Sequence, residues 1–274
     1  MKPGFDEGAD QPLEIDTSIA HSARVYDYWL GGKDNYAVDR ALGDAIAAQI
    51  PTMRSLARAN RAFMQRAVDY LVREVSIRQF LDIGTGIPTH GNVHEVAQAI
   101  VPESRVVYVD NDPIVLVHAR ALLTSHPAGR TAFIGADIRH PDGVLHDPEL
   151  RATLDLDQPV ALMLVAILML VADADDPYGT VSVLVDALPS GSHVVISHPT
   201  ADFNPEAVAA VVAASAQAGL TLVPRDLAGV EAFFRGLELL DPGVVPMQDW
   251  RPTLESSVRN PQSPYYWAGV ARKP

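Results

Sequence analysis

The stretch Phe80-Leu-Asp-Ile-Gly-Thr-Gly-Ile-Pro88 decides the fold, because a short apolar run turns directly into a glycine loop there. The run Gln79–Ile83 has the length of a strand and carries one acidic residue, Asp82, near its end. Gly84 and Gly86 allow the backbone to approach a ligand closely, and a helix that follows presents its N-terminal amides to that ligand. The stretch therefore predicts a ligand site at the end of a buried strand.

Apolar runs of strand length alternate with helical patterns through most of the chain. This alternation is typical of βαβ units, in which right-handed crossovers join the strands of a parallel sheet. The expected strands are 79–83, 105–109, 131–134, 160–165 and 193–197. The expected helices are 90–100, 113–124, 177–188, 205–218 and 226–235, followed by a closing pair of strands at 237–247 and 265–271. The predicted fold class is therefore α/β, with a doubly wound sheet.

The N-terminal quarter has a different pattern, which is helical from about residue 18 to residue 75. Gly31-Gly32 and Pro51 interrupt it, and apolar residues recur at three- and four-residue steps within 52–75. Residues 1–17 mix Gly, Pro, Asp and Glu without periodicity. We therefore expect a loose tail at 1–17, a helical cap at 18–75 and a Rossmann-like domain at 76–274.

Composition narrows the classes of protein further. The 274 residues include 48% hydrophobic and 20% charged residues, which is enough apolar surface for a folded core. The net charge of −13 argues against nucleic acid as a partner, and the absence of cysteine excludes disulfides and thiolate metal sites. The longest uncharged apolar run, 159–172, is too short to cross a membrane, and no secretory signal is visible, so the cytoplasm is the expected compartment.

Polar residues follow the next two expected strands at the positions where each strand ends. Asp110 ends the second strand, where a carboxylate can accept both hydroxyl protons of a ribose. Asp137 and Ile138 follow the third strand and can meet the amino group and the face of an adenine. Asn111 either helps to bind the ribose or the adenine or only shapes the turn before the next helix. Asp137 can likewise be a turn residue instead of an adenine contact.

Two classes of cofactor use such a site, and the glycine loop separates them. A nicotinamide-binding loop has the spacing G-x-G-x-x-G, whereas Thr89 stands here in the position of the third glycine, after Pro88. Asp82 is also foreign to that fingerprint, and it suits a ligand that carries an ammonium group. An amino acid joined to an adenosine describes S-adenosylmethionine.

Several segments resemble the S-adenosylmethionine-dependent methyltransferases of a family common in actinobacteria, whose substrate is undefined. They are FLDIGTGIPTHGNVHEVAQ (80–98), VVYVDNDPIVLVHARALL (106–123), GADIRHP (135–141), ARVYDYWLGGKDNY (23–36), ANRAF (59–63), 173–177 and 197–199. The resemblance runs from about residue 18 to the C-terminus. It implies a seven-stranded methyltransferase sheet whose last strand lies antiparallel beside the fifth. It also implies that the donor site comprises Asp82, Gly84, Thr85, Gly86, Asp110, Asn111, Asp137 and Ile138, although Pro88 departs from the broader superfamily's loop.

A dense polar and aromatic stretch lies inside the helical N-terminal region and has two interpretations. It is either a lid over the donor and the acceptor or a corner at which Gly31-Gly32 ends a helix. The lid interpretation is favoured, and its candidate residues are Tyr28, Gly32, Lys33, Asn35 and Tyr36, with Tyr36 also a catalytic candidate. Asn60 and Arg61 are further candidates for substrate contact, with a solvated helix face as the alternative.

His198 follows the fifth strand and is the candidate general base, because an imidazole with a pKa near neutrality suits that work. It can equally be a histidine that is bonded to the adjacent turn. No metal site is expected: His90 and His94 lack an obvious third ligand, and Asp176 before Pro177 is typical of a helix cap.

The sequence thus predicts transfer of a methyl group from S-adenosylmethionine to an unidentified small-molecule acceptor. A non-catalytic sensor or scaffold that binds S-adenosylmethionine or S-adenosylhomocysteine is the alternative, because the donor signature does not report on turnover. The oligomeric state cannot be read from the sequence.

Overall fold

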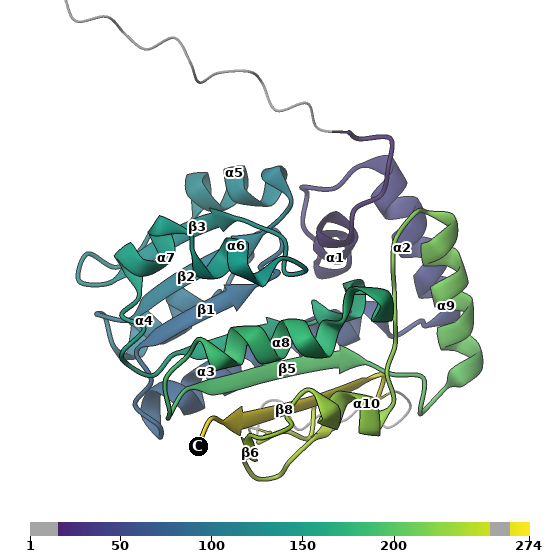
Figure 1. Ribbon diagram of the computed structural model, residues 1–274. Coiled ribbons are helices and arrows are strands. Elements are labelled where there is room, and N and C mark those ends of the chain that lie inside the picture. Colours follow the sequence, from purple (N-terminus) through teal and green to yellow (C-terminus); the bar gives the residue numbers. More distant parts are fainter. Residues whose placement is uncertain (1–15, 253–263) are drawn as a thin grey trace, which may run out of the picture.

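A computed structural model describes residues 16–252 and 264–274, which form one mixed sheet covered by helices (Figure 1). The tail expected at 1–17 lies outside the described residues except for its last two positions. The sheet runs in the order β3-β2-β1-β4-β5-β8-β6, with β7 also paired to β8. The strands are β1 (Gln79–Ile83), β2 (Arg105–Asp110), β3 (Arg130–Gly135), β4 (Ala161–Val165), β5 (His193–Pro199), β6 (Glu238–Leu239), β7 (Val245–Pro246) and β8 (Tyr266–Arg272).

Strands β1 to β5 run parallel to one another, and β8 runs antiparallel between β5 and β6. This arrangement confirms the predicted doubly wound sheet with its last strand antiparallel beside the fifth. The strand expected at 237–247 is instead two short strands, β6 and β7, which both pair with β8. A turn closed by a hydrogen bond from Gly243 N to Leu240 O (2.7 Å) separates them.

The helices begin where short polar side chains can accept hydrogen bonds from the first free amides. Four helices start with an Asp or Asn cap followed by proline, which has no amide hydrogen to satisfy. The helices are α1 (Ser22–Leu30), α2 (Ala37–Gln49), α3 (Met53–Arg73), α4 (Val93–Ile100), α5 (Pro113–Leu122), α6 (Pro141–Leu145), α7 (Pro148–Thr153), α8 (Pro177–Asp186), α9 (Pro205–Gln217) and α10 (Leu227–Ala232). The expected helix at 90–100 begins only at Val93, because Asn92 and Glu95 form a capping box before it.

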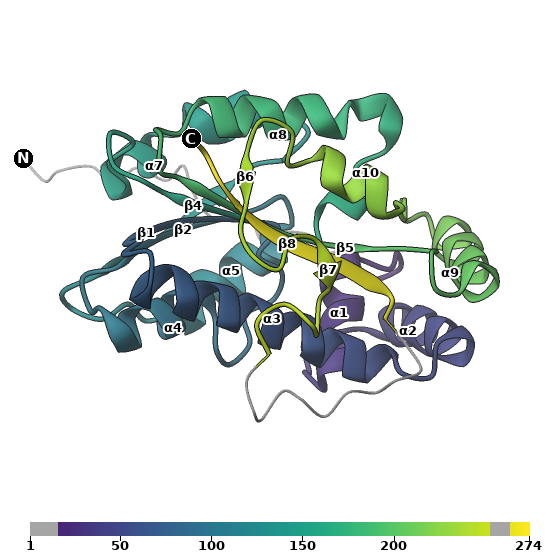
Figure 2. The ribbon, with the colours of Figure 1, turned by 90° about the horizontal axis from the view of Figure 1, so that it is seen from below.

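The sheet separates two apolar cores, because successive side chains along each strand point to opposite faces. One face carries Phe80, Val106 and Met163 and packs against α1, α2, α3, α4 and α9. The other face carries Leu81, Val107 and Leu162 and packs against α6, α7, α8 and α10. Figure 2 shows α3 and α4 on one side of the sheet and α8 and α10 on the other.

Helix α1 lies across the carboxyl ends of the parallel strands, between α5 and α2 (Figure 1). The apolar run 159–172 contains the strand expected at 160–165, which is the buried strand β4, and the short 3-10 helix at Leu168–Leu170. No helix within residues 16–252 or 264–274 is long and apolar enough to cross a membrane.

Candidate functional site

The glycine loop after β1 takes a conformation that glycine permits at two positions. Gly84 has φ +76°, and a Cβ there would lie 2.5 Å from the Ile167 side chain, so the loop packs tightly on the segment after β4. Gly86 has φ +67°, and a Cβ there would meet open space. Between them the Thr85 hydroxyl donates a hydrogen bond to Asp82 O (3.2 Å), which closes the turn. The loop is therefore held against the protein at Gly84 and open to a ligand at Gly86.

Asp110 at the end of β2 is fixed by two backbone amides. Its Oδ2 accepts from Gly86 N (2.9 Å) and its Oδ1 accepts from Asp112 N (2.9 Å). These bonds tie the glycine loop to β2 and set the orientation of the carboxylate, while burial raises the pKa of Asp110. Each carboxylate oxygen keeps a second lone pair, so the group can still accept two hydrogen bonds from a ligand.

Asp82 and Arg61 line the same cavity and carry opposite charges. Burial raises the pKa of Asp82 to about 7, and Asp110 raises it further whereas Arg61 lowers it. A carboxyl with this pKa is only partly ionised at neutral pH. A positively charged group of a ligand beside it would stabilise the carboxylate form and ionise it fully. The cavity thus offers Asp82 to a positively charged group of a ligand and Arg61 to a negatively charged group.

Arg61 reaches this cavity from α3 and is anchored at the start of α4. One terminal nitrogen donates to Gly91 O (3.1 Å) and to Asn92 Oδ1 (3.1 Å). Its Nε is buried and has no hydrogen-bond partner in the part of the chain that the structure describes. A buried N–H group without a hydrogen-bond partner destabilises the folded protein. A hydrogen-bond acceptor on a bound ligand can remove that cost.

Asp137 and Asn111 meet beyond the ends of β2 and β3. Asn111 Nδ2 donates to Asp137 Oδ2 (3.1 Å), and the Arg139 guanidinium donates to both Asp137 oxygens. These bonds, chiefly those from Arg139, lower the pKa of Asp137 to about 2, so its carboxylate stays ionised. Asp137 Oδ1 also accepts from Arg139 N (2.9 Å). Asp137 therefore stabilises the turn after β3, which was the alternative role that the sequence left open. Ile138 is buried beside it.

Two cavities of about 780 and 760 Å³ open at this edge of the sheet and share a junction. The first is lined by Asp82, Arg61 and Gly86, and the second by Asp137 and Ile138. The residues that line both are His21, Ser22, Gly84, Asp110, Asn111, Ile167 and Leu170. An elongated ligand with one charged end can therefore pass Asp110 on its way from one cavity to the other. We call this pair of spaces the donor cavity.

The first turns of α1 form a wall of the donor cavity. His21, Ser22 and Tyr26 line it, and the Tyr26 hydroxyl accepts from Asn60 Nδ2 (3.1 Å). Asn60 Oδ1 accepts in turn from Ser197 Oγ (2.6 Å), so one buried amide joins α1, α3 and β5. Asn60 is thus a link between elements as well as a cavity residue, and not part of a solvated helix face.

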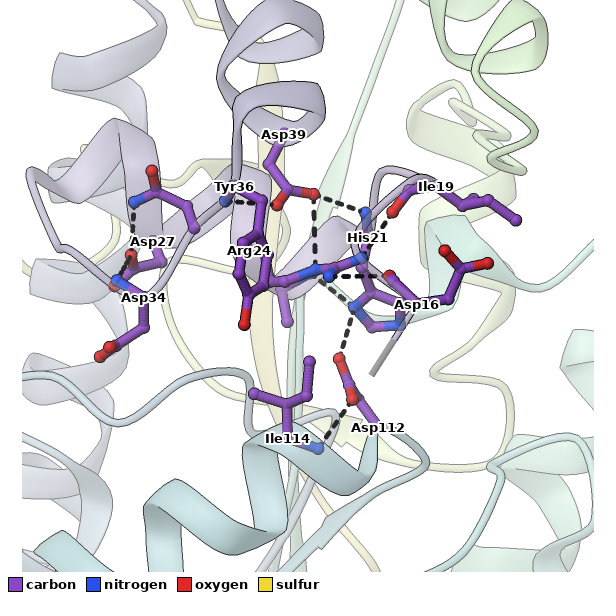
Figure 3. A network of polar contacts seen from close by, with 12 residues as sticks. Asp16, Ile19, His21, Arg24, Asp27, Asp34, Tyr36, Asp39, Asp112 and Ile114 are labelled. Atoms are coloured by element: carbon purple, nitrogen blue, oxygen red, sulfur yellow. Dashed lines mark hydrogen bonds and ion pairs between the residues drawn. The ribbon is translucent and has the colours of Figure 1, made fainter. Parts of the chain in front are cut away.

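The start of α1 is held by two carboxylates, which Figure 3 shows on either side of it. Asp39 accepts from His21 N (2.9 Å) and lies 3.4 Å from Arg24 Nε, and it is fully buried. Asp112 Oδ2 lies 3.0 Å from His21 Nδ1. Through these contacts α1 is tied to α2 on one side and to α5 on the other.

The stretch favoured as a lid is a corner between α1 and α2. Gly31 ends α1 in a left-handed conformation, and Gly32 leaves no room for a side chain because a Cβ would lie 1.8 Å from Asp27 Oδ1. Asp27 Oδ2 accepts from Asp34 N (3.0 Å) and from Asn35 Nδ2 (2.8 Å), as Figure 3 shows for Asp27 and Asp34. The polar side chains thus close the corner around Asp27 rather than reach the cavity.

The remaining lid candidates also lie away from the donor cavity. The Tyr28 hydroxyl donates to Asp44 Oδ1 (2.7 Å), and Lys33 is exposed. Tyr36 is exposed at the start of α2, where its ring lies 5.3 Å from the Arg24 guanidinium carbon. The structure does not bring Tyr36 to a place where it can touch a transferred methyl group.

His198 lies on the face of β5 that is turned away from Asn60 and the donor cavity. It is fully buried and stacks on Phe233, with the ring centroids 5.9 Å apart. Its Nδ1 contacts Pro199 O (2.9 Å) and its Nε2 contacts the Arg225 guanidinium (2.9 Å). Burial lowers the pKa of His198 to about 3. The base role expected for His198 is thus not supported, because both ring nitrogens are used within the fold.

The other histidine and aspartate alternatives have structural roles. His94 Nδ1 contacts the Tyr108 hydroxyl (2.8 Å), and both side chains are buried. Asp176 Oδ1 accepts from Gly179 N (3.0 Å), which confirms the helix cap, and Asp173 forms an ion pair with Arg225 (2.6 Å).

Sequence reasoning missed the α1 residues that line the cavity, although it singled out their segment. Ser22 and Tyr26 line the donor cavity, and with Val25 and Trp29 they follow the spacing i, i+3, i+4 and i+7, which places all four on one face of a helix. That spacing was the available signal, whereas the density of polar residues at 31–36 pointed to the corner instead.

The parallel strands, the antiparallel β8 and the donor cavity at the carboxyl ends together define a Rossmann-like methyltransferase that uses S-adenosylmethionine. The chain belongs to the S-adenosyl methyltransferase family, whose model matches residues 8–274. No curated protein matches the chain.

Solved structures support the same assignment. A DUF574 family protein from Streptomyces avermitilis is 49% identical, covering 94% of this chain and 99% of that one, with a TM-score of 0.91. A proposed methyltransferase from Thermobifida fusca is 38% identical, covering 96% and 98%, with a TM-score of 0.86. The plantazolicin methyltransferase BamL, solved with S-adenosylhomocysteine and a substrate analogue, is 12% identical, covers 92% and 95%, has a TM-score of 0.54 and shares the fold.

Proposed function

We propose that this methyltransferase acts on a small-molecule acceptor and holds its donor across Asp110. The observation that carries the proposal is the division of the donor cavity. One half offers opposite charges at Asp82 and Arg61, the other half offers Asp137 beside apolar Ile138, and Asp110 lines the junction. S-adenosylmethionine has the same three parts in the same order: a zwitterionic amino acid, a ribose and an adenine.

In this account Asp82 binds the ammonium group of the donor and Arg61 binds its carboxylate. The two residues lie on β1 and α3, so the amino acid end of the donor bridges the sheet and the helical region. The ammonium group would ionise Asp82 fully, and the carboxylate would supply an acceptor near the unpartnered Arg61 Nε.

Asp110 accepts hydrogen bonds from the ribose hydroxyls with the lone pairs that Gly86 N and Asp112 N leave free. Asp137 accepts from the adenine amino group in exchange for one of its hydrogen bonds from Asn111 or Arg139, and Ile138 packs on the ring. Gly86 leaves the space through which the donor passes.

When bound, S-adenosylmethionine supplies a methyl group on a sulfonium, which is already a good leaving group. The chain's own task is therefore positioning, which for well-aligned reactants is worth up to about 7–11 kcal/mol of the barrier. Tyr26 and Ser22 form the wall of α1 against which the reacting groups would lie.

Turnover separates this proposal from a non-catalytic sensor. The protein is incubated with donor carrying a labelled methyl group and with a fractionated small-molecule extract, and both label transfer and S-adenosylhomocysteine are measured. The enzyme account requires both to accumulate together, and to disappear in Asp110→Ala but not in the surface control Asp142→Ala. Tight donor binding without transfer to any fraction would favour the sensor.

A further inference from the structure

A third cavity of about 760 Å³ lies beside the donor cavity, and we call it the apolar chamber. Its walls come from α1, α2 and α9 and from Tyr265 and Tyr266 at the start of β8. Figure 1 shows α1, α2 and α9 together at one end of the molecule. Small-molecule sites are typically concave and mostly apolar with a few polar groups, and the lining of the chamber has this character.

The side chains that line the chamber carry no charge in the described part of the chain. Apolar contacts come from residues such as Trp29, Ile46, Val208, Val211 and Leu222. A charged group that entered would lose its hydration without gaining an ionic partner, which costs several kcal/mol. Phosphate, carboxylate and ammonium groups therefore do not fit this space.

Hydroxyl groups are the polar features of the chamber. The Tyr265 hydroxyl accepts from Asn204 Nδ2 (3.0 Å), whereas the Tyr266 hydroxyl has no hydrogen-bond partner among the described residues. Burial raises the pKa of Tyr266, so it remains a neutral hydroxyl. It can donate one hydrogen bond to a neutral polar atom and accept another from it.

The chamber and the donor cavity meet at a shared boundary. Ser22, Tyr26, Met169 and Leu170 line both the chamber and the half of the donor cavity that contains Asp82 and Arg61. That half is the one that holds the amino acid end of the donor in the proposed function, and the sulfonium adjoins this end. A molecule in the chamber would thus border the amino acid end of the donor, and through Ser22, Leu170, Leu220 and Thr221 it would also border the half that contains Asp137.

We propose that the apolar chamber is the acceptor site and that the acceptor is an uncharged, largely apolar small molecule. This inference rests on the proposed function. The ring or chain of the acceptor fills the chamber, and its acceptor atom lies at the boundary of Ser22, Tyr26, Met169 and Leu170. A lone pair of that atom forms the bond to the methyl carbon, the carbon–sulfur pair stays on sulfur, and the proton displaced from the acceptor passes to water.

The test uses the full chain saturated with S-adenosylhomocysteine and two probes that differ in charge, naphthol and naphthoate. Binding is followed by saturation-transfer NMR and by titration. Leu222→Asp places a carboxylate on the chamber wall at a partly exposed position, and binding of S-adenosylhomocysteine by this variant shows whether it folds. Leu122→Asp makes the same change at an exposed position on α5 and is the matched control.

We expect naphthol to bind at least about tenfold more tightly than naphthoate, since tenfold corresponds to only about 1.4 kcal/mol of the desolvation cost. Leu222→Asp should lower naphthol affinity by about tenfold or more, whereas Leu122→Asp should leave it unchanged. Both variants should bind S-adenosylhomocysteine as the wild type does. If the wild type did not bind S-adenosylhomocysteine, the proposed function itself would be contradicted.

Three outcomes would overturn the inference while leaving the donor site intact. The first is equal binding of naphthol and naphthoate by the wild type, and the second is equal binding of naphthol by Leu222→Asp and Leu122→Asp. The third is a dimer in the wild type that Leu222→Asp dissociates in sedimentation, which would assign the chamber to a second copy of the chain.

Discussion

Asp82 is a carboxyl that the fold keeps close to its ionisation midpoint. Burial and the neighbouring Asp110 raise its pKa to about 7, against the opposing effect of Arg61. Without a ligand, much of Asp82 is protonated at neutral pH and cannot attract a cation. Donor binding in our account therefore requires Asp82 to lose a proton.

Affinity for S-adenosylhomocysteine should consequently fall as the pH falls below about 7. Well below the pKa, the dissociation constant should rise by about tenfold per pH unit, because a protonated Asp82 must first ionise. Calorimetry between about pH 5 and pH 8 measures this dependence. Asp82→Asn should bind more weakly at pH 8 and show a flatter profile, and an unchanged slope in that variant would show that another group titrates.

His198 at the end of β5 has either a chemical or a structural task, and the geometry favours the structural one. His198→Ala should lower the free energy of unfolding by about 2–4 kcal/mol, because it opens a hole beside Phe233 and removes a partner from Arg225. Urea unfolding measures this change. Normal stability and donor affinity combined with lost methyl transfer would restore the base role.

The sequence could indicate which strand-end residues gather at one edge, but it could not give the direction of every side chain. Asp82, Asp110 and Asp137 come together because parallel strands end at the same edge. His198 follows a strand in the same way, yet its side chain points to the opposite face, and β5 alternates buried residues on both faces. Hydrophobicity on both sides of a strand gives no signal of which face carries the site.

Helix α1 is the element that separates the donor cavity from the apolar chamber. One face of it lines both spaces, and its ends are fixed by Asp39, Asp112 and the corner around Asp27. The position of α1 therefore depends on contacts outside the cavity. Substitutions at the corner should alter donor binding indirectly.

Gly31 and Gly32 give a matched pair for this expectation. Gly31→Ala should cost about 1–2 kcal/mol of stability, because Gly31 has φ +85° but open space around a Cβ. Gly32→Ala should cost more and weaken S-adenosylhomocysteine binding, because its Cβ would displace Asp27 from Asp34 and Asn35. Urea unfolding and calorimetry measure both effects. Equal losses in the two variants would argue against the corner as the support of α1.

At the level of elements, the sequence predicted the strands and the sheet topology well, since short apolar runs alternate clearly with helices. It did less well at 237–247, where a turn divides the expected strand into β6 and β7. It also misjudged the 31–36 corner, because a dense group of polar residues can satisfy a buried aspartate as well as a ligand. Local pattern does not distinguish these two uses.

The whole molecule combines a net charge of −13 with two adjoining sites of different character. The uncharged chamber opposes binding of ionic acceptors. In our account the polar donor cavity recognises the charged donor, and the apolar chamber recognises the neutral acceptor.

The most direct test of this account is calorimetric titration of the wild type, Asp110→Ala and Asp142→Ala with S-adenosylmethionine, S-adenosylhomocysteine and NAD. We predict that both sulfur ligands bind the wild type and Asp142→Ala, that Asp110→Ala loses both, and that NAD binds none of the three. Binding of the sulfur ligands by Asp110→Ala with wild-type affinity would contradict the proposed place of the donor. Failure of the wild type to bind either one would contradict the donor site itself.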